Sequence, residues 1–368
     1  AAKMSSPRHI WNKNLSCGAE VTGLTLATIS EEELVEVKKH FSDHGVVFFR
    51  GIDNGCLFTM DDHLKFAKRF GTINVNRFFN YVSSHPGIAK VEKVPGQKSA
   101  IGEYFHTDHS YDFAPALGSL LVARDLPATG GDTVFVDMAK AYDSLPQKIK
   151  EQLEGLRAVH SSRPVFGRRV IDKGTAKPLY NNPDAAMQTS IHPVVISHPL
   201  SKRKTLFVNP SFTLHFEGKT PEESKPLLET LYTAAVSPSN MTRFKWTKGS
   251  AILWDNRAVW HCAINDYHGQ HRLMHRVTID GEPLVAADSA GRGSEITKDP
   301  PTDVLALRYG QIMLELPYIS LQLSTIRNGM ANLQHKSADR IEPWWPDIRW
   351  YHVFSLRILS WLGIPARL

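Results

Sequence analysis

The feature that most constrains the fold is a series of short β-rich runs between about residues 115 and 280. Each run is rich in Val, Ile, Leu, Phe or Thr, and Gly, Pro or Asn residues separate it from the next. The runs lie at residues 120–123, 133–136, 193–197, 205–209, 251–254 and 275–279. Many short strands divided by turn residues are typical of a β-sandwich or jelly roll.

Helices are predicted before and between these runs. Ser30 precedes three glutamates and a set of apolar residues at helical spacing, so it predicts an N-cap with an acidic first turn. Further helices are predicted from Thr59 to a C-terminal Gly71, around residues 145–153 and from Thr220, with a buried strand at 46–49. The predicted fold class is therefore mainly β with flanking helices (α+β).

The composition changes after about residue 284. Residues 286–303 are small, polar and contain Pro and Gly, as a linker does, and four of the eight tryptophans follow at 344, 345, 350 and 361. We divide the chain into a domain of residues 10–284 and a linker with a helical C-terminal extension, residues 285–368. The extension could lie at a membrane interface, but its nearly balanced charge favours packing on the core or at a subunit interface of a homo-oligomer.

Composition also indicates the cellular compartment and the classes of partner expected for the protein. The 368 residues are 42% hydrophobic and 22% charged, as in an ordinary globular protein. Three cysteines allow at most one disulfide, so we expect a reducing, cytoplasmic compartment. No apolar run reaches the roughly 18 to 20 residues of a membrane span. The net charge is +6, but the sequence has no run of basic residues, so we expect no nucleic acid partner. A mildly basic protein of this kind is suited to binding small anionic molecules.

The sharpest local motif is His106-Thr107-Asp108. Alternate residues of a strand point to one face, so His106 and Asp108 could direct an imidazole nitrogen and a carboxylate at one point. With 17 histidines in the chain, such a pair taken alone favours a hydrogen-bonded His–Asp pair at a strand end over a metal site. A metal site therefore requires a third ligand.

His261 is the candidate for that ligand, because it follows a β-rich run and a polar turn. Two histidines and one carboxylate on one octahedral face form the ligand set of non-haem Fe(II) oxygenases. Arg272 and Arg276 would share one face of a strand over residues 272–279. A buried guanidinium is favourable only beside an anion, so two inward arginines imply two bound anions.

Five elements together resemble the taurine dioxygenase/TfdA family of Fe(II)- and 2-oxoglutarate-dependent dioxygenases. They are His106-Thr-Asp108, Gly130-Gly-Asp-Thr133, Leu206-Phe-Val-Asn209, Trp254-Asp-Asn-Arg257 and the segment from His261 through Arg272 to His275-Arg276. Their order and spacing match the family across about residues 10–284. The resemblance implies a double-stranded β-helix, or jelly roll, which agrees with the run of short strands.

The resemblance also implies roles for individual residues. His106, Asp108 and His261 would bind Fe(II), and Thr133 with Arg272 would bind the distal carboxylate of 2-oxoglutarate. Arg276 would bind the acidic group, a carboxylate or sulfonate, of a small to medium organic substrate. The expected reaction consumes O2, releases succinate and carbon dioxide, and oxidises the substrate, most simply by hydroxylation.

Alternatives remain at this point. The same cofactors could support desaturation, epoxidation or cyclisation in a biosynthetic pathway, and a cupin-like binding jelly roll is the non-enzymatic alternative. Phe105 stands where the family often has Trp, and Trp260 and Cys262 flank His261. These differences mean that the resemblance does not determine the shape of the substrate pocket. The aromatic-rich stretch 76–81 falls where the family contacts substrate. No motif identifies the carbon skeleton of the substrate.

Overall fold

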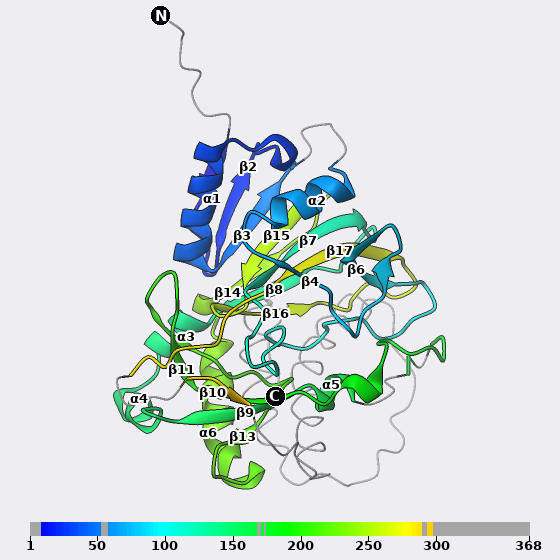
Figure 1. The fold of residues 1–368 in the computed structure, drawn as a ribbon. Coiled ribbons are helices and arrows are strands. Elements are labelled where there is room, and N and C mark those ends of the chain that lie inside the picture. Colours follow the sequence, from blue (N-terminus) through cyan, green and yellow to red (C-terminus); the bar gives the residue numbers. More distant parts are fainter. Residues whose placement is uncertain (1–8, 53–57, 168–170, 173, 289–292, 297–368) are drawn as a thin grey trace, which may run out of the picture.

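The computed structural model describes residues 9–52, 58–167, 171–172, 174–288 and 293–296, and within these the fold is mainly β (Figure 1). The predicted fold class is confirmed at this level. Most of the predicted C-terminal extension, with its four tryptophans, lies outside the described residues. In the described part, no helix is long and apolar enough to cross a membrane.

The largest sheet has the strand order β1-β2-β3-β15-β7-β17-β6-β5, with β4 also paired to β17. Its strands are β1 Ile10–Asn12, β2 Ala19–Thr22, β3 Val46–Arg50, β4 Ile73–Asn74, β5 Tyr81–Val82, β6 His85–Lys93, β7 Gly118–Asp125, β15 Ser250–Asp255 and β17 Arg272–Ile279. All its pairs are antiparallel except β2 with β3.

Three smaller sheets complete the β structure. The first is β14 Met241–Phe244, β8 Thr133–Asp137 and β16 Val259–Ala263. The second is β13 Thr213–Phe216, β9 Arg157–Ser161, β10 Thr189–Pro193 and β18 Glu295–Ile296. The third is the pair β11 Val195–Ser197 and β12 Lys204–Leu206. The run predicted at 193–197 is thus divided between two sheets, and the run at 205–209 leaves the strand after Leu206.

The helices lie outside the sheets (Figure 1). They are α1 Glu31–His44, α2 Met60–Ala67, α3 Met138–Asp143, α4 Gln147–Gln152, α5 Arg163–Phe166 and α6 Pro221–Ala235. Ser30, Thr59 and Thr220 each form a capping box, as their local sequences predict. The predicted end of the second helix at Gly71 is wrong, because α2 stops at Ala67 with Lys68 as its C-cap.

The core is layered around the large sheet and the β14-β8-β16 sheet. Apolar residues of α1 and α2, such as Phe41 and Phe66, pack on one face of the large sheet. The opposite face contributes Phe48 and Trp254, which pack against Phe135 of the smaller sheet. Helices α3 and α6 cover the far side of that smaller sheet. A space between two facing sheets is thereby available for a site.

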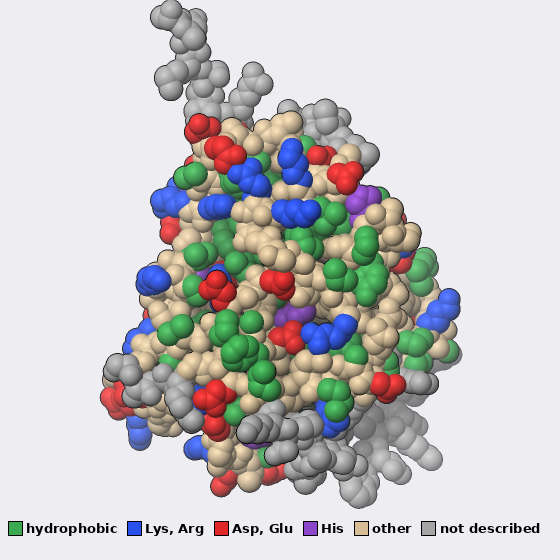
Figure 2. Space-filling model, viewed as in Figure 1, with side chains coloured by type: hydrophobic (Ala, Val, Ile, Leu, Met, Phe, Trp, Pro, Cys, Tyr) green, Lys and Arg blue, Asp and Glu red, His purple; other side chains and the backbone are tan. Residues whose placement is uncertain are grey.

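Charged side chains are mixed over the face of the molecule shown in Figure 2. Basic and acidic groups are interspersed there, and hydrophobic side chains form scattered groups between them. The net positive charge of the chain is therefore not concentrated in one field on this face.

Close backbone packing makes Gly118 irreplaceable at the start of β7. It is paired with Asp255 on one side and Ile279 on the other. A Cβ atom at this position would lie 2.0 Å from the carbonyl oxygen of Trp254. The two strands that would have to move apart, β7 and β15, both belong to the core of the large sheet. Even the smallest side chain at residue 118 would therefore force a backbone shift.

We therefore expect Gly118→Ala to lower the free energy of unfolding by about 3 kcal/mol, since overpacking a rigid core costs about that much. Urea denaturation measures the change. Gly96→Ala is the matched control, because its Cβ would meet only the Thr175 methyl group at 3.4 Å. Equal stability of the two variants would contradict the proposed close packing.

Two buried histidines face each other in the second small sheet. His160 on β9 and His192 on β10 are both fully buried, with ring centroids 5.3 Å apart. Burial lowers the pKa of His160 well below its ordinary value and that of His192 to about 4. Both rings are therefore neutral in the folded protein at pH 6, whereas they gain protons in the unfolded chain near pH 6.5.

Because the unfolded chain binds more protons, the contribution of this pair to stability falls as the pH falls. From pH 7.5 to 5.5 each histidine should remove about 1.4 kcal/mol of unfolding free energy. We expect His160→Asn to reduce the difference in stability between these two pH values by about that amount, as measured by urea unfolding. An unchanged pH difference in the variant would contradict the depressed pKa.

Candidate active site

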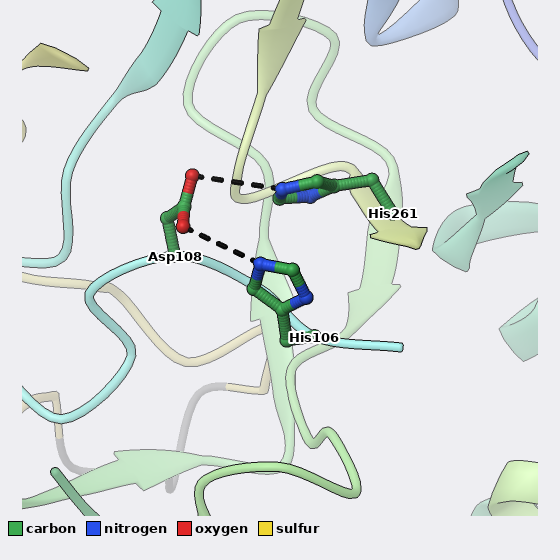
Figure 3. A group of neighbouring side chains, drawn as sticks. All are labelled: His106, Asp108 and His261. Atoms are coloured by element: carbon green, nitrogen blue, oxygen red, sulfur yellow. Dashed lines mark ion pairs between the residues drawn. The ribbon is translucent and has the colours of Figure 1, made fainter. Parts of the chain in front are cut away.

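Two histidines and an aspartate meet beside the β14-β8-β16 sheet (Figure 3). His106 and His261 form an isolated antiparallel bridge, with backbone N···O distances of 3.1 and 3.0 Å in the two directions. The Nε2 atoms of His106 and His261 lie 3.5 and 3.7 Å from the two carboxylate oxygens of Asp108. The potential ligand atoms all lie within 4.8 Å of one another. The structure thus brings together all three predicted metal ligands.

The expected strand around this motif is wrong in part. His106 pairs with β16 as a single bridge, and Asp108 lies in the turn that follows. The convergence of the two side chains therefore does not come from the alternation of a strand. It comes from the turn, which carries the carboxylate back toward the two imidazoles.

The protonation of the three side chains suits metal binding. His106 Nδ1 lies 2.7 Å from the carbonyl oxygen of Tyr104, which can only accept, so Nδ1 carries the proton and Nε2 offers its lone pair. Burial, with the neighbouring His106, lowers the pKa of His261 well below its ordinary value. Although burial opposes ionisation, Arg276 and His261 hold the pKa of Asp108 well below its ordinary value. A neutral His261 imidazole and an ionised Asp108 carboxylate result, and both suit a metal ion.

The two predicted arginines both lie on β17 and line the same cavity. Arg276 places Nη1 3.2 and 3.3 Å from the two oxygens of Asp108. Nε and Nη2 of Arg272, and the same two atoms of Arg276, have no hydrogen-bond partner among the described residues. These side chains are buried, and a buried guanidinium needs an anionic partner. The predicted sharing of one face by the two arginines is confirmed.

Thr133 begins β8 and also lines the cavity. Its hydroxyl accepts a hydrogen bond from the indole Nε1 of Trp246 at 3.0 Å, and the Arg272 guanidinium carbon lies 5.9 Å from the Trp246 ring. Gly131 precedes it with a φ of +72°, and a Cβ there would lie 3.1 Å from Cδ of Arg272. Glycine at this turn therefore lets the chain pass close to Arg272.

The cavity has a volume of about 250 Å³, and its lining includes Arg272, the triad and a group of aromatic rings. Asn76 and Phe79, from the stretch expected to contact substrate, line it. Phe105 and Trp260 are not among the described lining residues, because both pack in the cluster beside α3 and α6. Cys262 belongs to the same cluster, as its place beside His261 on a strand predicts.

A buried polar chain borders the cavity on the side of β6. Lys93 on β6 contacts the side-chain oxygen of Asn265, and Asn265 Nδ2 donates to Glu103 at 2.6 Å. Burial raises the pKa of Glu103 to about 7. Lys93 lies 4.6 Å from the centre of the Tyr267 ring, and Arg272 lies 5.9 Å from the same ring. The amide of Asn265 thus joins a buried cation to a buried acid.

The sequence of this chain matches the family described as "Taurine catabolism dioxygenase TauD, TfdA family" over residues 9–278. The chain belongs to this family. Family membership makes it an α-ketoglutarate (2-oxoglutarate)-dependent dioxygenase, and it favours the enzymatic interpretation over a binding jelly roll.

Individual relatives agree with the assignment. An alkylsulfatase from Acinetobacter baylyi is 30% identical over 285 residues, which cover 77% of this chain and 88% of the relative. An α-ketoglutarate-dependent 2,4-dichlorophenoxyacetate dioxygenase from Burkholderia is 31% identical over 259 residues, covering 66% and 84%. The crystal structure of a taurine dioxygenase from Burkholderia xenovorans has a TM-score of 0.65 and 29% identity, covering 83% of this chain and 99% of that one.

Sequence reasoning missed several residues that shape the site of this dioxygenase. It did not find Trp246 beside Thr133, nor the chain of Lys93, Asn265 and Glu103. Lys93 and Asn265 are separated by 172 positions, so no local pattern joins them. The signal that could have found Lys93 is its cross-strand register with Arg272, because directly paired strand residues share a face.

Proposed function

We propose that His106, Asp108 and His261 bind one Fe(II) ion. The observation that carries this proposal is the meeting of two imidazole Nε2 atoms and one carboxylate within 4.8 Å, beside two buried arginines with unsatisfied nitrogens. Two nitrogens and one oxygen on one face suit Fe(II) and leave coordination positions for other molecules. When bound, the iron supplies the activation of dioxygen that couples decarboxylation of 2-oxoglutarate to oxidation of the substrate.

The protein's own part in this reaction is to bind and orient two acids. Arg272, with Thr133 beside it, would hold the distal carboxylate of 2-oxoglutarate through charge-assisted hydrogen bonds. Arg276 lies four residues along β17, about 13 Å away at the usual strand rise, and would hold the acidic group of the substrate. The two arginines therefore separate the two acids along the cavity.

The expected substrate is a small to medium organic anion. One relative is named an alkylsulfatase and another a 2,4-dichlorophenoxyacetate dioxygenase, and one buried arginine fits a carboxylate, sulfonate or sulfate. Hydroxylation at a carbon a few bonds from the acid is the simplest outcome. Because Arg276 also contacts Asp108, the acid of the substrate would lie close to the iron ligands.

We further propose that the facing sheets form a double-stranded β-helix over residues 10–284, and that the enzyme acts in the cytoplasm as a homo-oligomer. The described cysteines, Cys17 and Cys262, are free and buried, which suits a reducing compartment. Residues 285–368 would then act as a linker and helical extension. Within them, Glu295–Ile296 pair with β10, so the first part of this segment lies against the domain.

Removal of one ligand should abolish metal binding. We expect His106→Ala and Asp108→Ala each to weaken Mn(II) binding by about 100-fold or more, because the remaining two ligands cannot complete the face. Isothermal titration with Mn(II) measures this in the absence of turnover. His268→Gln, at an exposed histidine near the site, is the control and should bind like the unmodified protein. Unchanged affinity in either Ala variant would refute the metal assignment.

The two arginines should have separable effects on steady-state kinetics. Arg272→Gln should raise the KM for 2-oxoglutarate about 10- to 100-fold, because one or two charge-assisted hydrogen bonds are lost. Arg276→Gln should instead raise the KM of the organic substrate and leave the KM for 2-oxoglutarate unchanged. Succinate release measures both constants. The assignment fails if the two variants exchange these effects or share them equally.

A further inference from the structure

The end of the cavity nearest Arg276 is built from aromatic rings. We call Phe79, Tyr111, Phe166, Tyr180 and Phe212 the aromatic wall, and all five line the cavity. Their ring centroids are 4.9 Å apart for both Phe166–Tyr180 and Tyr111–Phe212, and 5.8 Å apart for Phe79–Tyr180. All three pairs are edge-to-face, so each ring fixes its neighbour. The wall is therefore a preformed apolar surface.

This wall adjoins both the triad and one cation. Phe212 lies edge-on to His106, with centroids 6.3 Å apart. The guanidinium carbon of Arg276 lies 4.5 Å from the centre of the Phe79 ring, and two of the nitrogens of Arg276 have no partner among the described residues. A molecule that binds here therefore meets a positive charge at one edge and rings beyond it.

The lining offers no free negative charge for an ammonium group. Its two described carboxyls are Asp108 and Glu103. Asp108 is paired with Arg276 and the two histidines. Glu103 accepts hydrogen bonds from Asn265 and from the backbone N–H of Ala100, and Asn265 links it to the cation of Lys93. Both acids therefore already have hydrogen-bond partners in the protein, and each has a cationic side chain nearby.

The amide of Asn76 is also committed. Its oxygen accepts the N–H of Phe78 at 2.8 Å, and its nitrogen donates to His109 at 2.9 Å. This side chain lies at the start of the segment that carries Phe79, so its bonds hold the backbone of that segment. It is therefore not free to solvate a cationic group on a substrate.

We propose that the substrate is an organic acid with a single anionic head and an aryl body, and that it carries no ammonium group. This inference rests on the proposed function, since Arg276 must serve as the anchor for the acid. The anionic head binds Arg276, and the aryl ring packs on the aromatic wall. Zwitterions such as amino acids and taurine are rejected, because a buried ammonium would find no counter-charge there.

Matched ligands test the two parts of the proposal separately. 3-Phenylpropanoate and phenylalanine differ only by the ammonium group, and 3-phenylpropanoate and butanoate differ mainly by the ring. Isothermal titration on the Mn(II)- and 2-oxoglutarate-loaded protein should show 3-phenylpropanoate binding at least about 30-fold tighter than phenylalanine. It should bind at least about 5-fold tighter than butanoate. The proposal would be overturned if phenylalanine or butanoate bound as tightly as 3-phenylpropanoate, or if 3-phenylpropanoate did not bind.

A variant of the wall links this selectivity to the structure. Phe79→Leu keeps the site apolar but removes one ring, so it should weaken the binding of 3-phenylpropanoate about 5-fold more than it weakens the binding of butanoate. Tyr81→Leu, at a more exposed ring on the same segment, is the matched control. If Phe79→Leu does not fold, Phe166→Leu tests the same surface. A wall variant that leaves the preference for the aryl acid intact would overturn the role of the wall.

Failure of the proposed function would be visible separately. If the protein did not bind 2-oxoglutarate in the presence of Mn(II), the cofactor assignment would fail whichever acid is selected. The same three acids titrated into the metal-free protein would still report the selectivity of the aromatic wall and Arg276. A preference for the aryl acid without 2-oxoglutarate binding would therefore support the proposed ligand class and refute the proposed 2-oxoglutarate-dependent reaction.

Discussion

The active site depends on the pair of backbone hydrogen bonds between His106 and His261. These bonds join a loop to β16 across 155 positions of sequence and set the two imidazole rings 4.1 Å apart. The alternation of β16 then turns Trp260 and Cys262 into the apolar cluster beside α3 and α6, while His261 faces Trp254 and Phe135. The same packing that stabilises the sheet therefore also orients the second imidazole. Asp108 needs only the following turn to complete the group.

Charge is the second constraint on the site. Two guanidinium groups are buried on one strand, and one of them, Arg276, contacts the carboxylate that completes the triad. Removing such groups from water is costly unless anions replace the lost solvation. A site of this kind is therefore adapted to molecules that bring negative charge with them, and its selectivity depends on which further charges the lining can match.

The parts of the fold that follow from local physics could be predicted from the sequence. The capping boxes at Ser30 and Thr220 need only neighbouring residues, and the shared face of Arg272 and Arg276 follows from strand periodicity. Residues brought together by tertiary packing could not be found this way. The aromatic wall comes from separate segments, and the turn that positions Asp108 replaces the strand expected from its spacing to His106. Composition likewise indicated a linker where Glu295–Ile296 pair with β10.

The most direct test of the account is to locate the metal. Crystals grown anaerobically with Fe(II) and 2-oxoglutarate should give an anomalous difference peak at the iron absorption edge. The account predicts one strong peak, about 2.0 to 2.2 Å from Nε2 of His106, Nε2 of His261 and a carboxylate oxygen of Asp108, distances usual for first-row metals with these ligands. A peak at any other group of side chains, or none at this triad in iron-loaded crystals, would contradict it.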